Sequence, residues 1–159
     1  MLQLSPTLRQ CAQFTPLKKF KKVKRLAELV TRKEQISLCD KLVEYYKKIY
    51  EGTEFAKEEK ILSHAEVGEV EYTYPGPQNE VDAAVKMNAI AKALRLGYDA
   101  PAIVLKKNGR LILVDGHRRL RVAWEQGIGW PALLIVPSKP VSFGVEKTVM
   151  GKIKDLFKT

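Results

Sequence analysis

The fold of this chain is decided by the stretch Gly109-Arg-Leu-Ile-Leu-Val-Asp-Gly-His-Arg-Arg-Leu-Arg-Val-Ala-Trp-Glu-Gln-Gly127. Its apolar run Leu111 to Val114 has the length and β-branched content of a strand, and it follows the hairpin turn signal Asn108-Gly109. Asp115-Gly116 interrupts the run, and the apolar spacing is then helical as far as Gly127, a residue typical of left-handed helix caps. The stretch predicts a strand, a tight glycine turn and a helix in direct succession.

The predicted turn is a candidate site for an anion. The first N–H groups of a helix have no partners within the helix, and its N-terminal end carries a partial positive charge. Gly116 and His117 lie in the turn, and Arg118 and Arg119 add two cations to the first helical turn. These four residues are the candidate phosphate- or nucleotide-binding residues. The alternative is a plain strand-to-helix connection that carries basic side chains.

Three ionisable residues are candidates for catalysis: Asp115, His117 and Glu66. Asp115 could act as a base or hold a divalent metal ion. His117 could be a general acid or base, a phosphate ligand, or merely a helix cap. Glu66 lies close to His64 in the sequence, and the two could line the same cleft as the turn, the alternative being an exposed strand end.

Residues 61–137 are predicted to form a small α+β domain with a mixed sheet. Alternation of valine with glutamate indicates a strand before the loop Pro75 to Asn79, and apolar residues at helical spacing follow that loop. The predicted elements are strands within 61–74, 100–105, 111–114 and 130–136, and helices over 81–96 and, after a connector, over 145–157. Residues 138–159 therefore form a basic C-terminal tail.

Residues 1–60 are predicted to be a basic helical appendage. A helix over residues 33–51 carries Cys39 on its apolar face, which favours a buried thiol. Tyr45, Tyr46 and Tyr50 on this helix favour core or interface packing over stacking on bases. The appendage could dock on the following domain, mediate dimerisation or bind nucleic acid.

The positive charge of the chain is concentrated outside the central domain. The net charge is +10, of which residues 1–60 contribute +6, residues 61–137 contribute +1 and residues 138–159 contribute +3. Basic flanks favour a polyanionic partner, here DNA, through phosphate contacts that read no base sequence. The alternative is a solvated basic face. The candidate DNA-binding residues form one amphipathic cluster: Lys18, Lys19, Lys21, Lys22, Lys24 and Arg25.

Features of membrane and exported proteins are not found in this sequence. It has no signal peptide pattern and no apolar run of the roughly 18 residues that a membrane helix needs. Its two cysteines, Cys11 and Cys39, have neither metal-ligand spacing nor the pattern of a disulfide framework. We therefore expect a cytoplasmic protein without a membrane partner, located at the nucleoid if it binds DNA.

The signature Asp-Gly-His-Arg-Arg-Leu-Arg-Val-Ala, which begins at Asp115, resembles the Gly-x-x-Arg signature of the ParB/sulfiredoxin superfamily. The order of predicted elements around it is also similar, over about residues 61 to 137. The resemblance implies a ParB/sulfiredoxin-like fold. Sulfiredoxins carry a cysteine directly after the glycine, where this chain has His117, so sulfinic acid reduction is not expected.

Two branches of this superfamily imply different functions. ParB-type proteins bind DNA and hydrolyse CTP with Mg²⁺, and their Gly-Glu-Arg-Arg signature matches at Arg118 and Arg119 but not at His117. Their second nucleotide motif, Glu-Asn-x-x-Arg, would fall near Glu146, where its Asn and Arg are missing. Free serine kinases, which use ATP or ADP, have a signature similar to Asp-Gly-His-His-Arg, and their Pro-His-Glu segment loosely resembles Ser63 to Glu66.

The charge of the flanks decides between these branches, because a kinase for a small amino acid has no need of it. We expect a ParB-like, DNA-associated protein that binds CTP, ATP or ADP with Mg²⁺, and whose enzymatic activity would be that of a nucleotide hydrolase or a nuclease. The alternative is a small-molecule kinase similar to the free serine kinases. A third alternative is an adaptor that has kept only the fold.

Overall fold

The computed structural model describes residues 29–73 and 80–157 of the chain. Two compact units are present, one that combines Val30–Asn79 with Asp99–Thr159 and one that combines Met1–Leu29 with Glu80–Tyr98. In the latter, the described part is mainly helix α4 (Glu80–Leu94), which agrees with the helix predicted over 81–96. Gly97 follows α4 with a positive φ of 91°, as expected of a residue that ends a helix.

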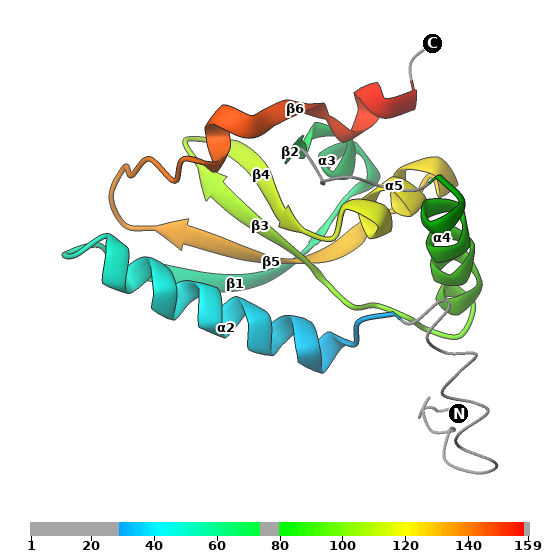
Figure 1. Ribbon diagram of the computed structural model, residues 1–159, viewed down its shortest axis with the longest axis horizontal. Coiled ribbons are helices and arrows are strands. Elements are labelled where there is room, and N and C mark those ends of the chain that lie inside the picture. The colour runs from blue at the N-terminus through cyan, green and yellow to red at the C-terminus, as the bar shows by residue number, and fades with distance from the viewer. Residues whose placement is uncertain (1–28, 74–79, 158–159) are drawn as a thin grey trace. The chain divides into compact units, whose positions relative to one another are not determined.

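The first of these units has an α+β fold around one six-stranded mixed sheet in the order β1-β5-β3-β4-β2-β6 (Figure 1). The pairs β5–β3 and β4–β2 are parallel, and the pairs β1–β5, β3–β4 and β2–β6 are antiparallel. The strands are β1 (Phe55–Leu62), β2 (Glu71–Thr73), β3 (Ala102–Lys107), β4 (Arg110–Asp115), β5 (Trp130–Pro137) and β6 (Val149–Lys152). The fold class predicted from the sequence is confirmed.

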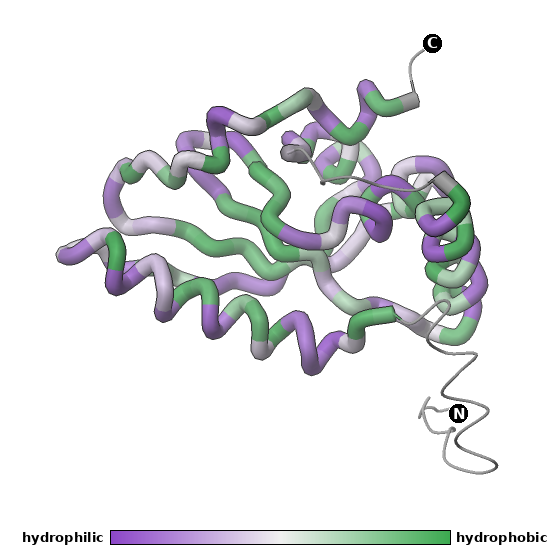
Figure 2. The backbone as a smooth tube through the Cα atoms, viewed as in Figure 1, coloured by the Kyte–Doolittle hydropathy of each residue, from purple (hydrophilic) through white to green (hydrophobic). Residues whose placement is uncertain are grey.

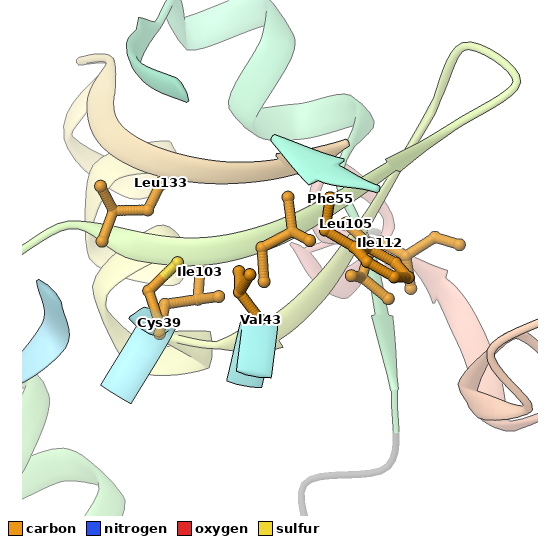
Figure 3. Packing of buried hydrophobic residues seen from close by; sticks show 8 residues of the cluster. Cys39, Val43, Phe55, Ile103, Leu105, Ile112 and Leu133 are labelled. Carbon is orange, nitrogen blue, oxygen red and sulfur yellow. The ribbon is translucent and has the colours of Figure 1, made fainter. Parts of the chain in front are cut away.

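Helix α2 (Arg32–Ile49) covers one face of this sheet. Its buried residues Cys39 and Val43 pack against Ile103 and Leu105 of β3 and Ile112 of β4 (Figure 3). Figure 2 shows the matching pattern, in which the central strands are mostly hydrophobic and α2 alternates between hydrophobic and hydrophilic residues. The expected burial of the Cys39 thiol is confirmed, with 1% of the residue exposed.

The alternate residues of the central strands, Val104 and Leu134 among them, are buried on the opposite face of the sheet. Helices α3 (His64–Glu69) and α5 (His117–Gln126) pack against each other there, together with the 3₁₀ turn η2 (Ile153–Phe157). Because β3 and β5 are buried on both faces, they form the centre of the core. The hairpin at Asn108-Gly109 is also confirmed, with positive φ angles of 50° and 80°.

The predicted domain boundary at residue 60 does not coincide with a boundary between the compact units. Strand β1 runs across this position and pairs with β5 along its whole length. Tyr46 and Tyr50 of α2 pack against Phe55 of β1 and against Phe143, which confirms the packing role predicted for them. Tyr45 is 56% exposed. Residues 30–62 are thus an integral layer of the α+β unit.

Two predicted elements are wrong. The predicted strand within 61–74 is interrupted by α3, because Ser63 caps a helix there: the Glu66 N–H donates to Ser63 Oγ (3.1 Å), and the Ser63 N–H donates to Glu66 Oε1 (2.9 Å). The predicted helix over 145–157 is instead the 3₁₀ turn η1 (Val145–Thr148), strand β6 and η2. Pairing of β6 with β2 overrides the local helical pattern.

Within the described ranges 29–73 and 80–157, no helix is both long and apolar enough to cross a membrane.

Candidate functional site

The candidate site is the turn between β4 and α5, as the sequence predicts. Asp115 is the last residue of β4, and Gly116 is the N-terminal cap of α5 with φ of 116°. The first bond of the helix runs from the Leu120 N–H to the Gly116 carbonyl (3.0 Å). Asp115 lies opposite Ile103 of β3, next to a register shift of the kind that is frequent beside functional sites.

Asp115 is held by two side chains from different elements. Arg119 Nη2 donates to Asp115 Oδ2 (3.0 Å), and Nε2 of Gln35 in α2 donates to the same oxygen (2.9 Å). Gln35 Nε2 also donates to the Pro101 carbonyl (3.0 Å). The Asp115 side chain is still 43% exposed, so its carboxylate is anchored through one oxygen while part of the group faces solvent.

Arg119 has a more restricted role than the sequence indicates. It is only 5% exposed, and its Nη2 atom is committed to the carboxylate of Asp115. Its Nη1 atom is buried and has no hydrogen bond partner among the described residues. Arg119 is therefore first a structural ion pair, with one guanidinium nitrogen left that an anion could use.

His117 packs on the side of α5 that faces β2. Its ring lies 5.4 Å from the ring of Tyr72, measured between centroids, and both of its ring nitrogens are buried without a hydrogen bond partner in the described part of the chain. Burial, with the neighbouring charges of Arg121 and Arg118, lowers the pKa of His117 from 6.5 to about 4. At neutral pH its imidazole is therefore uncharged, with one N–H donor and one acceptor nitrogen.

This lowered pKa predicts an acid-sensitive stability. The unfolded chain takes up a proton at His117 below about pH 6.5, whereas the folded chain does so only near pH 4. Above pH 6.5 the His117 ring is neutral in both the folded and the unfolded chain, so the free energy of unfolding is not reduced by this residue. It should then fall toward pH 4, by up to about 1.4 kcal/mol per pH unit from this residue alone.

The measurement is a series of urea unfolding curves between pH 7.5 and 4.5 on the wild type and on His117→Phe, which keeps a ring against Tyr72. Titration of carboxylates cancels in the difference between the two proteins. The wild type should lose more stability on acidification than His117→Phe. Equal losses in both proteins would contradict the neutral, buried imidazole.

His117 and Arg119 approach the turn from different sides. Residues two apart in a helix are separated by about 200° around its axis. The contacts agree, since His117 meets β2, whereas Arg119 lies against Gly116 and Asp115. Arg118, partly exposed between them, belongs to the same helical turn. The unpartnered nitrogens of His117 and Arg119 therefore lie on different sides of the first turn of α5.

His64 and Glu66 are not assembled at this turn by any contact that the structure records. The His64 ring stacks on Trp124 (centroids 4.1 Å apart, planes at 5°), and its Nε2 lies 3.0 Å from the Trp124 carbonyl oxygen. Trp124 is about 10 Å along the helix axis from His117, so His64 lies at the opposite end of α5. Glu66 completes the cap of α3 and accepts a bond from Lys60 Nζ (2.8 Å).

The candidate DNA-binding residues lie outside the residues that the structure describes. They are Lys18, Lys19, Lys21, Lys22, Lys24 and Arg25.

A metal ion could be held at this site only with few protein ligands. Among residues 29–73 and 80–157, no group of three or more His, Cys, Asp or Glu side chains is placed to hold one. Mg²⁺ commonly binds through one or two carboxylates, with water and substrate phosphates completing its shell. The single carboxylate of Asp115 is enough for such a site, because part of its side chain is exposed.

Sequence comparison does not assign the site. No protein-family model matches the chain, and no curated protein sequence matches it.

Two residues at the site were not predicted from the sequence. Gln35 and Tyr72 come from α2 and β2, and their partners Asp115 and His117 lie 80 and 45 positions further along the chain. The polar Gln35 on the apolar face of a predicted helix was the available signal, because a glutamine there needs hydrogen bond partners.

Proposed function

We propose that this protein is a ParB-like nucleotide-binding protein that associates with DNA, and that the N-terminal end of α5 binds a phosphate of the nucleotide. One observation carries the proposal. Buried nitrogen atoms of His117 and Arg119 have no hydrogen bond partner among the described residues, and both belong to the first turn of α5. A buried N–H group without a partner costs about 1–3 kcal/mol, and an anion would accept from Arg119 Nη1 and from the one N–H of the neutral His117 ring.

The rest of this helical turn supports the same ligand. It contains no acidic residue, and its N-terminal cap, Gly116, has no side chain that could accept from the first N–H groups. The partial positive charge of the helix end and the charge of Arg118 favour an anion there, whereas the charge of Arg119 is offset by Asp115. In this proposal the backbone N–H groups near His117 and Arg118 position the phosphate, Arg118 neutralises it, and His117 and Arg119 Nη1 donate from two sides.

Asp115 is the residue that would hold Mg²⁺ when a nucleotide is bound. The ion would supply charge neutralisation between phosphate oxygens. Gln35 and Arg119 keep the carboxylate in place through Oδ2. The exposed part of the carboxylate is thereby left to face the ligand.

The test of this function is calorimetric titration with CTP, ATP and ADP in the presence of Mg²⁺. Each titration should be run with and without duplex DNA and with and without free serine. Binding of a nucleotide, strengthened or followed by hydrolysis when DNA is present, is the expected result. Failure to bind any of the three would contradict the proposal. Phosphorylation of serine without DNA would favour the kinase, although His64 lies at the far end of α5 from the turn.

Arg118 gives a direct prediction. Loss of a hydrogen bond between charged groups costs about 1.5–3 kcal/mol, so Arg118→Gln should weaken nucleotide binding roughly tenfold to a hundredfold. Its matched control is Lys106→Gln, which removes the same charge from an exposed side chain at the hairpin end of β3, away from the turn. Equal affinity of both variants for the nucleotide would place the phosphate elsewhere.

A further inference from the structure

Gln35 is an exception within the apolar face of α2. It is 1% exposed and lies on the same helical stripe as Cys39 and Val43, four and eight residues later, which pack into the hydrophobic core. Burying an amide costs about 1–3 kcal/mol unless it is hydrogen-bonded. Leucine or methionine would fill this position without that cost, so the amide must be explained by its bonds.

The two N–H groups of the Gln35 amide have one acceptor each. They donate to the Pro101 carbonyl (3.0 Å) and to Asp115 Oδ2 (2.9 Å). Asp115 Oδ2 also accepts from Arg119 Nη2 (3.0 Å). The carboxylate oxygen is therefore fixed between α2 on one side and α5 on the other, by one neutral donor and one cationic donor.

The helical turn that carries Gln35 is itself fixed. Thr31 and Glu34 form a capping box at the start of α2. Arg32 ion-pairs with Glu59 of β1 (2.5 Å) and with Asp99 (3.2 Å). Because these contacts hold the first turn of α2 against the sheet, the amide of Gln35 has a defined direction toward Asp115.

We infer that Gln35 is a positioning residue of the phosphate site, which orients the carboxylate of Asp115 and, through it, the guanidinium of Arg119. The inference rests on the proposed function of the turn and adds α2 to it. A positioning role differs from a purely structural role in one respect. A structural amide would affect only how much protein is folded, whereas a positioning amide also changes the affinity of the folded protein for its ligand.

The experiment compares Gln35→Met, which keeps the volume and removes both hydrogen bonds, with Val43→Ala on the same stripe. Val43 contributes to the core cluster and has no recorded contact with the turn, so it controls for lost stability. Titrations of CTP, ATP and ADP with Mg²⁺ are made well below both unfolding midpoints. Gln35→Met should bind about tenfold more weakly than the wild type, and Val43→Ala within about twofold of it. Wild-type affinity in a destabilised Gln35→Met would overturn the inference.

A second variant, Gln35→Glu, tests the positioning role through the pH dependence of nucleotide affinity, which a purely structural role would not change. At pH 7.5 its carboxylate faces that of Asp115 and should weaken binding further than Gln35→Met does. On acidification the new carboxyl group takes up a proton and becomes a donor again. Relative to the wild type, the affinity of Gln35→Glu should therefore recover toward pH 5, whereas that of Gln35→Met should not. The same pH profile in both variants would contradict positioning through a hydrogen bond.

Failure of the proposed function is separated from failure of this inference by NMR. If the wild type binds none of the three nucleotides, the proposed function is rejected. The positioning role of Gln35 is then tested by the backbone amide signals of Gly116 and His117. Shifts of these signals in Gln35→Met but not in Val43→Ala would still establish that Gln35 positions the turn. Unshifted signals would overturn it.

Discussion

Gly116→Ala is expected to destabilise the protein by about 3 kcal/mol and to disrupt the turn that carries the candidate site. Gly116 has φ of 116°, a conformation that side chains rarely adopt. A Cβ atom there would lie 2.9 Å from Ala102 Cβ, 3.1 Å from Ala102 Cα and 3.0 Å from Arg119 Nη2. The Ala102 atoms belong to a buried central strand, so the turn rather than the strand must shift.

The matched control is Gly127→Ala at the other end of α5. Gly127 also has a positive φ, of 72°, but a Cβ atom there would meet nothing within 4 Å among the described atoms. Its cost should be the backbone term alone, about 1 kcal/mol. Urea unfolding of the two variants measures the difference, which is the contribution of the close contacts with Ala102 and Arg119.

The site adds a second readout to this comparison. Displacement of Gly116 moves the first turn of α5, so Gly116→Ala should also lose nucleotide binding under conditions where it remains folded. Gly127→Ala should bind like the wild type. Equal destabilisation by the two substitutions would mean that the turn has room for a side chain, contrary to its packing in the structure.

The elements predicted correctly have short-range causes. The hairpin follows from Asn108-Gly109, and the end of α5 follows from Gly127, where the Gly127 and Ile128 N–H groups donate to Trp124 and Ala123 carbonyls at 3.2 and 3.0 Å. Helix α2 follows from apolar periodicity after its cap Thr31, and α4 follows from apolar periodicity that ends before Gly97. In these segments local preference and tertiary packing agree.

The two wrong predictions concern segments where the local apolar pattern competes with a helix cap or with strand pairing. Residues 61–74 alternate like a strand, but Ser63 and Glu66 form a capping box whose sequence pattern was available. Val67 and Val70, three residues apart, are both buried, as a helical turn allows. Strand β6 had no comparable local signal, because it exists through its pairing with β2, about 80 residues earlier in the chain.

The chemistry of the turn was only partly predictable for the same reason. The strand, the glycine and the arginines follow one another in the sequence, so the turn itself could be identified. The burial of Arg119 against Asp115 depends on Gln35 and Ala102. These two residues are distant from the turn in the sequence and are brought to it by the fold. The sequence makes both Arg118 and Arg119 candidate phosphate ligands, whereas the structure separates a partly exposed Arg118 from a buried Arg119.

DNA affinity is expected to reside in the basic cluster between Leu17 and Leu26 and to depend steeply on salt. This stretch carries six basic side chains between Lys18 and Arg25, whereas residues 61–137 together have a net charge of only +1. Each phosphate contact contributes about −0.9 to the slope of log affinity against log salt for duplex DNA. About four contacts from the cluster would give a slope near −3.6.

Replacing Lys21, Lys22 and Lys24 together with Gln should flatten this slope by up to about three units, since each phosphate that is no longer neutralised removes about 0.9 from it. The weakening should be similar on unrelated duplexes, because phosphate contacts carry no base information. The matched control replaces three exposed lysines of helix α2 with Gln, which removes the same number of charges outside the cluster: Lys41, Lys47 and Lys48.

Two outcomes of these gel-shift titrations would change the assignment. If the control triple flattens the slope as much as the cluster triple, the protein responds to its net charge and the cluster has no special contact with DNA. If the unmodified protein shifts neither duplex nor single-stranded DNA at low salt, the association with DNA fails. Nucleotide binding would then have to be explained without DNA, and a small-molecule kinase would become the leading function, because its phosphate site needs only the turn at Gly116.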